Sequence, residues 1–186
     1  MTINFSKNND VIVPNNSNAY RGLYGDDTYI LTNQISSKQN ISIVDTNGLN
    51  KIQFIDNFEF KETKFANNAF QLTLDNGSVI TINSAQSFTY EIGGNATNNE
   101  KGIIYSYAEL ASLLGFENLP KSGAVENFSG YEVINDELKI KIANFKWNIK
   151  KPESVGLESI EVDNLMDYLK TPGFNTQAAI LIKGNN

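Results

Sequence analysis

The chain has 186 residues, of which 40% are hydrophobic and 11% aromatic, so it can bury a core large enough to fold without disulfide bonds. It contains no cysteine and no histidine, which excludes thiolate nucleophiles, Cys/His metal sites, and Ser-His-Asp or Cys-His catalytic centres. The 21 acidic and 15 basic residues give a net charge of −6, the wrong sign for a protein that binds the phosphate backbone of nucleic acid.

The first nineteen residues are rich in asparagine and show little hydrophobic periodicity. We expect residues 1–19 to form an extended lead-in or edge piece. The N-terminus has no cationic segment followed by an apolar run, and no later stretch approaches the roughly 18 apolar residues of a membrane-spanning helix. The sequence therefore predicts no membrane insertion, and the protein either stays inside the cell, leaves it by a route that needs no cleaved leader, or begins at a point after such a leader.

From Thr28 onward, short runs of alternating apolar residues recur between Gly, Asn and Asp. This alternation is typical of strands with one buried face. We predict a mainly β fold, either an antiparallel sandwich or an irregular β-roll-like solenoid, with two short helices. The clearest strands carry Ile41/Ile43, Ile52/Phe54, Phe58/Phe60, Phe70/Leu72/Leu74, Ile80/Ile82 and Phe88/Tyr90/Ile92.

The turn after Leu74 can be predicted in more detail, because the loop length must keep one face of the hairpin apolar. A two-residue Asn-Gly loop would pair Leu72 with Thr81 and mix the two faces. A three-residue loop, 75–77, pairs Leu72 with Ile80 and Phe70 with Ile82. We therefore predict the longer loop, with Gly77 in the left-handed conformation.

Residues 106–115 predict a short helix, capped by Ser106 and ended by Gly115. We place a boundary after it, which gives a lead-in (1–19), a β module (20–116) and a second β-rich part (117–186). The second part has strand patterns at 131–133, 138–142, 145–149 and 179–182, with a turn at Asn135-Asp136 and a turn or bulge at Ala143-Asn144. A second helix is expected from Asp163 to a stop at Thr171-Pro172-Gly173.

Residues 22–30, Gly-Leu-Tyr-Gly-Asp-Asp-Thr-Tyr-Ile, resemble one copy of the RTX calcium-binding nonapeptide, Gly-Gly-x-Gly-x-Asp-x-hydrophobic-x. Gly22, Gly25, Asp27 and Tyr29 match this pattern, and Leu23 replaces its second glycine. Glycines let such a turn curl so that carbonyl groups point inward, and the aspartate adds a hard anionic oxygen. In this family calcium lies between successive turns, so one copy provides half a site.

A second turn at 45–52 keeps the glycine, as Gly48, and leads into a strand, but it has Asn50 where the family has aspartate. Glycine turns do not recur at a fixed period, since Gly25, Gly48 and Gly77 are 23 and 29 residues apart. Plain turn chemistry also accounts for these polar residues. The resemblance implies a structural Ca²⁺ ion, and the candidate ligands are Gly22, Tyr24, Asp26, Asp27, Asp45, Asn47 and Asn50.

The broader stretch 20–115 is similar to modules of bacterial RTX-type surface proteins and adhesins. The resemblance implies leaderless export by a type I system and a cell-surface or extracellular location. It also implies a role in adhesion or surface-layer (S-layer) assembly, with a surface protein or glycan as partner and self-association as a further interaction. No catalytic activity is implied.

Two alternatives of other classes follow from the residues. A carbohydrate-binding module would use an aromatic platform, for which Tyr20, Tyr24, Tyr29 and Trp147 are candidates, although core packing explains Trp147 more simply. A glycoside-active enzyme would need two carboxylates across a cleft, such as Glu158 and Glu161, which surface charge explains more simply.

Overall fold

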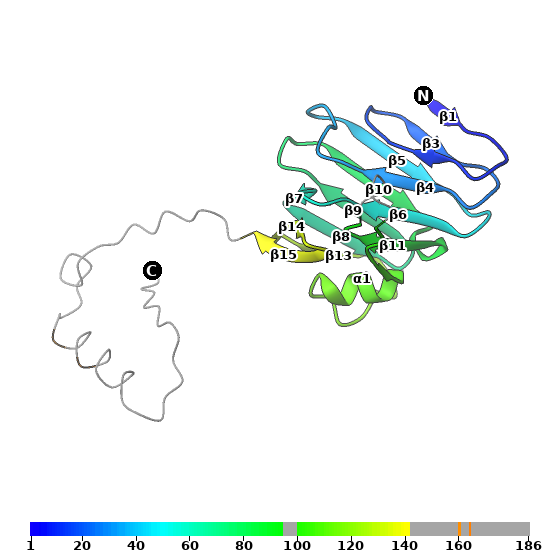
Figure 1. The fold of residues 1–186 in the computed structure, drawn as a ribbon. Coiled ribbons are helices and arrows are strands. Elements are labelled where there is room, and N and C mark those ends of the chain that lie inside the picture. Colours follow the sequence, from blue (N-terminus) through cyan, green and yellow to red (C-terminus); the bar gives the residue numbers. More distant parts are fainter. Residues whose placement is uncertain (95–99, 142–159, 161–163, 165–186) are drawn as a thin grey trace. The chain divides into compact units, whose positions relative to one another are not determined.

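A computed structural model describes residues 1–94, 100–141, 160 and 164 of the chain (Figure 1). Contacts between Cα atoms divide the chain into two compact units, Met1–Ala143 and Asn144–Asn186. The turn expected at Ala143-Asn144, the strands expected at 145–149 and 179–182, and the helix expected from Asp163 lie outside the described residues.

The described residues are mainly β, with one α-helix and one 3-10 turn. The helix α1 spans Tyr107–Leu113 and the 3-10 turn η1 spans Ala85–Ser87. The strands are β1 (Thr2–Asn4), β2 (Val11–Ile12), β3 (Ala19–Arg21), β4 (Thr28–Leu31), β5 (Asn40–Val44), β6 (Asn50–Phe54), β7 (Glu59–Phe60), β8 (Glu62–Ala66), β9 (Ala69–Thr73), β10 (Val79–Asn83), β11 (Phe88–Ile92), β12 (Ile103–Tyr105), β13 (Ala124–Asn127), β14 (Gly130–Ile134) and β15 (Glu137–Lys141).

These strands form three sheets (Figure 1). The seven-stranded sheet has the order β1-β3-β5-β10-β9-β8-β13, the five-stranded sheet β12-β11-β6-β4-β2, and the three-stranded sheet β15-β14-β7. From β1 to β6 the chain alternates between the two larger sheets, and β10 and β11 resume this alternation after β7–β9. Within each of the two sheets, the strands of this series pair in parallel with one another, in the orders β1-β3-β5-β10 and β2-β4-β6-β11.

The mainly β prediction is therefore confirmed, but a purely antiparallel arrangement is wrong for the N-terminal strands. Antiparallel pairs join sequence neighbours across a short turn, as between β9 and β10 or β14 and β15, and also join β8 to β13 and β7 to β14. Parallel pairs need a longer connection, and here each connection passes through the other sheet.

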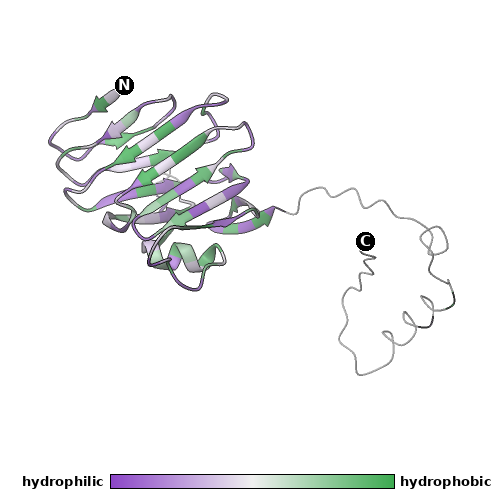
Figure 2. Cartoon of the chain, turned by 180° about the vertical axis from the view of Figure 1, so that it is seen from behind, coloured by the Kyte–Doolittle hydropathy of each residue, from purple (hydrophilic) through white to green (hydrophobic). Residues whose placement is uncertain are grey.

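Alternation of apolar and polar residues determines which face of each strand is buried, and Figure 2 shows this alternation as bands along the strands. Ile43, Phe54, Phe70 and Tyr90 belong to one buried cluster to which both larger sheets contribute. The rings of Phe70 and Tyr90 meet edge to face across it, 6.2 Å apart. Burial of each such side chain contributes about 1.5–3 kcal/mol.

The hairpin predicted at 75–77 is confirmed. Leu72 lies opposite Ile80 and Phe70 opposite Ile82, and Gly77 has a φ of +81°. The first predicted helix is confirmed as well, because Ser106 and Glu109 form a reciprocal capping box and Gly115 follows the helix with a φ of +88°.

The N-terminal nineteen residues contribute β1 and β2, which are the edge strands of the two larger sheets. Residues beyond 116 also join the first unit, since β13 pairs with β8 and β14 pairs with β7. The turn expected at Asn135-Asp136 connects β14 to β15, and both residues have positive φ, as a two-residue hairpin turn requires.

Candidate metal centre

Three turns that lead from the seven-stranded to the five-stranded sheet lie in register at one end of the strands. They are residues 5–10, 22–27 and 45–50, called here the stacked turns. Because Tyr20 lies opposite Ile43, the start of the second turn, Gly22, aligns with Asp45 at the start of the third. Pairing of β4 with β6 likewise aligns Asp27 with Asn50.

Asp27 is part of a polar ladder that crosses the stacked turns. Its Oδ1 accepts the N–H of Asp10 at 2.7 Å, and its own N–H donates to Asn50 Oδ1 at 2.9 Å. The side chains of Asp27 and Asn50, in the second and third turns, therefore each accept a backbone N–H from the preceding turn. The alignment of Asn50 with the aspartate of the nonapeptide, expected from the sequence, corresponds to this ladder.

The carboxylates of Asp27 and Asp45 converge beside Gly22. A Cβ atom added to Gly22 would overlap the Oδ2 atoms of both aspartates, so only glycine leaves room for the pair. The hydroxyl group of Tyr29 donates to Asp45 Oδ2 at 2.8 Å and accepts the N–H of Gly22 at 2.6 Å. Two anionic groups from successive turns are thus held together in the interior.

The electrostatics of this pair are unfavourable as it stands. Asp27, Asp45 and Tyr29 are all buried, and Asp27 Oδ2 has no hydrogen-bond partner among the described residues. Burial and then the neighbouring Asp45 raise the pKa of Asp27 from 3.8 to about 6, although the N–H of Asp10 acts in the opposite direction. Two adjacent buried carboxylates repel each other when both are ionised, and a shared proton or a bound cation removes that repulsion.

The other predicted ligands lie around this pair in different roles. Asn47 accepts the side-chain N–H of Asn50 at its carbonyl group, 3.1 Å away. Asp26 is exposed and ties the turns together, since its Oδ1 accepts the N–H of Leu49 at 2.8 Å. Tyr24 is exposed, with the ammonium group of Lys7 5.9 Å from its ring centre. The fold therefore brings together Gly22, Asp27 and Asp45, with Asn50 and Asn47 beside them, and leaves Tyr24 and Asp26 on the surface.

Sequence reasoning missed the first stacked turn, because residues 5–10 contain no glycine. The sequence signal for this turn was its last residue. Asp10 stands directly before the strand residues Val11 and Ile12, as Asp27, seventeen residues later, stands directly before Thr28 and Tyr29. The role of Tyr29 was also missed. Its position was predicted as the hydrophobic residue of the motif and as part of an aromatic platform, yet its hydroxyl group binds Asp45.

A cavity of about 230 Å³ opens beside Asp45. Its lining also includes the side chain of Arg21 and the polar residues Thr46 and Asn47. Of the two carboxylate residues, only Asp45 lines this cavity.

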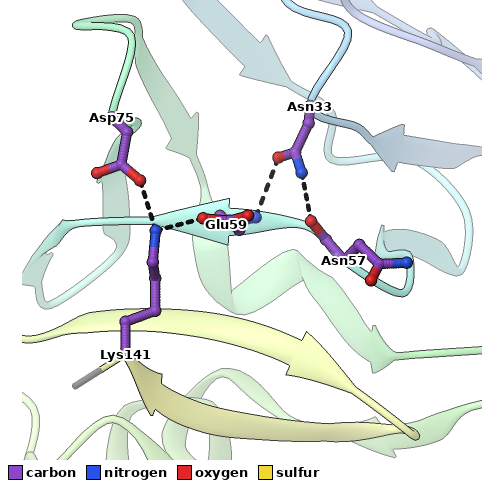
Figure 3. A network of polar contacts seen from close by, with 5 residues as sticks. All are labelled: Asn33, Asn57, Glu59, Asp75 and Lys141. Atoms are coloured by element: carbon purple, nitrogen blue, oxygen red, sulfur yellow. Dashed lines mark hydrogen bonds and ion pairs between the residues drawn. The ribbon is translucent and has the colours of Figure 1, made fainter. Parts of the chain in front are cut away.

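A second polar cluster connects β7, the 75–77 loop and β15 (Figure 3). The ammonium group of Lys141 forms ion pairs with Glu59 and Asp75, and these contacts raise the pKa of Lys141. Asn33 accepts the N–H of Glu59 at 3.0 Å and donates to the carbonyl group of Asn57. Here the chain supplies the cation between two carboxylates itself.

The donor set at the stacked turns suits a hard cation. Within residues 1–94 and 100–141, no three acidic side chains converge on one point. A Ca²⁺ ion, which binds six to eight oxygen atoms, would therefore take two carboxylates and complete its shell with carbonyl, amide or water oxygens.

The expected aromatic platform is wrong for Tyr20 and Tyr29, because both rings are buried and cannot stack on a sugar. Trp147, Glu158 and Glu161 lie outside the described residues. The carbohydrate-binding and glycoside-active alternatives stay predictions, which a glycan array and chromogenic glycosides would test.

No protein-family model, curated protein or solved structure matches the chain. Among the helical residues that the structure describes, none belongs to a helix long and apolar enough to cross a membrane.

Proposed function

We propose that the stacked turns bind a Ca²⁺ ion between Asp27 and Asp45, and that this ion stabilises the β module. The single observation that carries the proposal is the convergence of two buried carboxylates on Gly22, with one oxygen, Asp27 Oδ2, left without a partner. A divalent cation would neutralise both charges and occupy that oxygen.

A hard divalent ion fits this site better than a softer metal. The sequence contains no histidine or cysteine, and the side chains around the pair are carboxylates and amides, which offer oxygen ligands. A proton shared by the two carboxylates is the competing explanation, and it would satisfy the same oxygen. A bound Ca²⁺ ion and a shared proton predict different effects of calcium on the melting temperature near neutral pH.

The wider function that we propose is that of a β-roll-like module of RTX type, at the cell surface or secreted by a leaderless type I route, in adhesion or surface-layer assembly. Two features support it. The nonapeptide-like segment 22–30 aligns with residues 45–53 in the parallel strand pairing, and the paired carboxylates come from successive turns, as the resemblance implies.

A calcium titration of thermal unfolding tests the proposal. We expect millimolar Ca²⁺ to raise the melting temperature and a chelator to reverse the shift, because a ligand of the folded state adds about 2.7 kcal/mol at a hundredfold excess over its Kd. Asp56→Asn, which removes an exposed carboxylate outside the site, is the matched control and should keep the response.

Asp27→Asn separates the ion from the shared proton. Without calcium this variant should be more stable than the parent at pH 7, because an amide next to Asp45 removes the repulsion and can donate to it. It should also lose the response to Ca²⁺. A parent protein whose unfolding temperature is the same in calcium and in chelator at pH 7 would leave the shared proton as the explanation and end the proposal.

A further inference from the structure

The two ends of the strand stack differ in how their cores are covered. At one end, α1 packs against β11 and β12 and buries Tyr107, Leu110 and Ala111. At the other end, β1 and β2 are the outermost strands of the two larger sheets. Within the described residues, no further strand pairs with the outer edge of either one.

This second end, called here the β1/β2 edge, exposes apolar side chains. Val11 and Val13 are 71% and 48% exposed. Ile3 and Phe5 pack against the core but are only partly buried, although Ile3 aligns with the core residue Tyr20 of the next strand. An open stack of strands that shows apolar residues and free backbone groups at its end is prone to pair with another strand.

The direction of the free backbone groups follows from the hydrogen bonds that β1 and β2 form with their neighbouring strands. The carbonyl group of Met1 accepts from Ala19 and the N–H of Phe5 donates to Arg21, both at 2.9 Å. Because alternate residues of a strand point to opposite sides, the N–H and C=O groups of Thr2 and Asn4 point to the open edge. In β2, the carbonyl group of Asp10 accepts from Thr28, so the amide of Val11 faces outward in the same way.

Charge favours a second copy of the chain as the partner at this edge. The first twenty residues carry one lysine, Lys7, and one aspartate, Asp10, whereas the whole chain has a net charge of −6. Two copies can therefore meet at the β1/β2 edge without the mutual repulsion that more acidic parts of their surfaces would cause.

We propose that the β1/β2 edge is a dimer interface, at which two copies of the chain pair about a two-fold axis. An axis that runs through both larger sheets sets β1 antiparallel to β1 of the partner subunit and β2 antiparallel to its β2. Both sheets then continue across the interface, and each copy contributes the same edge, as in other two-fold dimers. The proposal is independent of the Ca²⁺ site, and its test is run with and without chelator to keep the two apart.

Sedimentation of the full chain over a range of concentrations tests this inference. We expect a reversible increase from the 20.7 kDa monomer to twice that mass. In hydrogen exchange, the amides of Thr2, Asn4 and Val11 should become protected as the concentration rises. A chain that stays at the monomer mass up to about 1 mM would overturn the proposal.

Two variants and a control locate the interface. Val11→Lys combined with Val13→Lys places like charges at the paired edges and should weaken the dimer about ten-fold or more, with no core residue changed. Asn4→Pro removes one outward N–H without touching the bonds to β3 and should weaken it too. Ile104→Lys, at the opposite edge of the five-stranded sheet and 55% exposed, is the matched control and should leave the dimer intact.

A dimer that Ile104→Lys dissociates as strongly as the double variant would mean head-to-tail assembly through β12, and it would contradict the proposal. Circular dichroism of each variant checks that the fold is kept. If the double variant does not fold, Asn4→Pro and the exchange of the outward amides decide the question.

Discussion

Two pairs of carboxylates in this molecule have opposite surroundings. Glu59 and Asp75 lie at the surface, and Lys141 from β15 places its ammonium group between them (Figure 3). Asp27 and Asp45 are buried, and no basic side chain among the described residues forms an ion pair with them. The chain neutralises the pair that water already screens and leaves the costlier pair without a protein cation.

Folding stability alone therefore does not explain why Asp27 and Asp45 are buried side by side. A buried pair of carboxylates destabilises the fold unless a proton or a cation binds between them. The exposed ion pairs of Lys141 with Glu59 and Asp75 change the free energy of unfolding only a little. Four measurements test this contrast between the buried and the exposed carboxylates, and the expected change in stability decreases from the first to the last.

Gly22→Ala should have the largest effect, a loss of about 3 kcal/mol in the free energy of unfolding and of any calcium response. The new methyl group displaces both carboxylates, which Asp10 and Tyr29 hold by hydrogen bonds. Chemical denaturation measures the loss. Gly130→Ala is the control, because its added Cβ would have its nearest neighbour at 3.4 Å. Equal losses in the two variants would show that the carboxylate pair tolerates the methyl group.

The buried pair should also make stability depend on pH when a chelator is present. The pKa of Asp27 is raised to about 6 in the folded protein, above its ordinary 3.8. The folded state therefore binds this proton more tightly, and the stabilisation is complete below about pH 4 and lost as the pH rises through 6. The loss is on the order of 2 kcal/mol.

Denaturation at several pH values, with Asp27→Asn as the reference, isolates this effect from that of the other acidic groups. The stability difference between the parent and the variant should grow between pH 4 and pH 6 and level off above. Calcium should remove that difference above pH 6. A difference that does not change with pH would contradict a raised pKa of Asp27 in the metal-free protein.

Lys141→Met tests the exposed pair and should cost about 1 kcal/mol, because the three charges are partly exposed and screened by water. High salt should reduce this cost. Lys139→Met removes a lysine whose ion-pair partner among the described residues is Glu137 on the same strand, and it should cost less. A salt-independent loss at Lys141 would indicate that its methylene groups, and not its charge, hold β15 in place.

Leu23→Gly should have the smallest effect, a gain of about 0.5 kcal/mol. Leu23 occupies the second glycine position of the nonapeptide and has a φ of +84°, which costs a leucine about 1–2 kcal/mol. Glycine relieves that strain but adds chain entropy to the unfolded state. Leu49→Gly, in the next turn and without a positive φ, gains no such relief, so thermal unfolding should show opposite signs for the two variants.

Local features of the fold could be predicted from the sequence. The 75–77 hairpin follows from matching Leu72 to Ile80, and the helix follows from Ser106 and Glu109, because in each case the residues that decide are close in the chain. Parallel pairing could not be predicted in the same way. The alternation in β4 is the same whether it pairs with a neighbour or with β6 two strands later.

The candidate site was predictable in part for the same reason. Asp27 could be chosen from its own turn, whereas the approach of Asp45 to Gly22 depends on the register of two distant strands. Without that register, Asp45 has the appearance of an ordinary turn residue. The exposed positions of Tyr24 and Asp26 likewise depend on which way each turn faces once the turns are stacked.

The connections between the two larger sheets have a practical consequence. At the end that carries the carboxylate pair, the connecting segments 5–10, 22–27 and 45–49 have nearly constant length. At the other end they are 13–18, 32–39 and 55–78, and the last of these accommodates three whole strands. Foreign loops or epitopes should accordingly be tolerated when grafted into the exposed stretch 36–38, whereas lengthening the 22–27 segment by one residue should shift Asp27 out of register with Asn50.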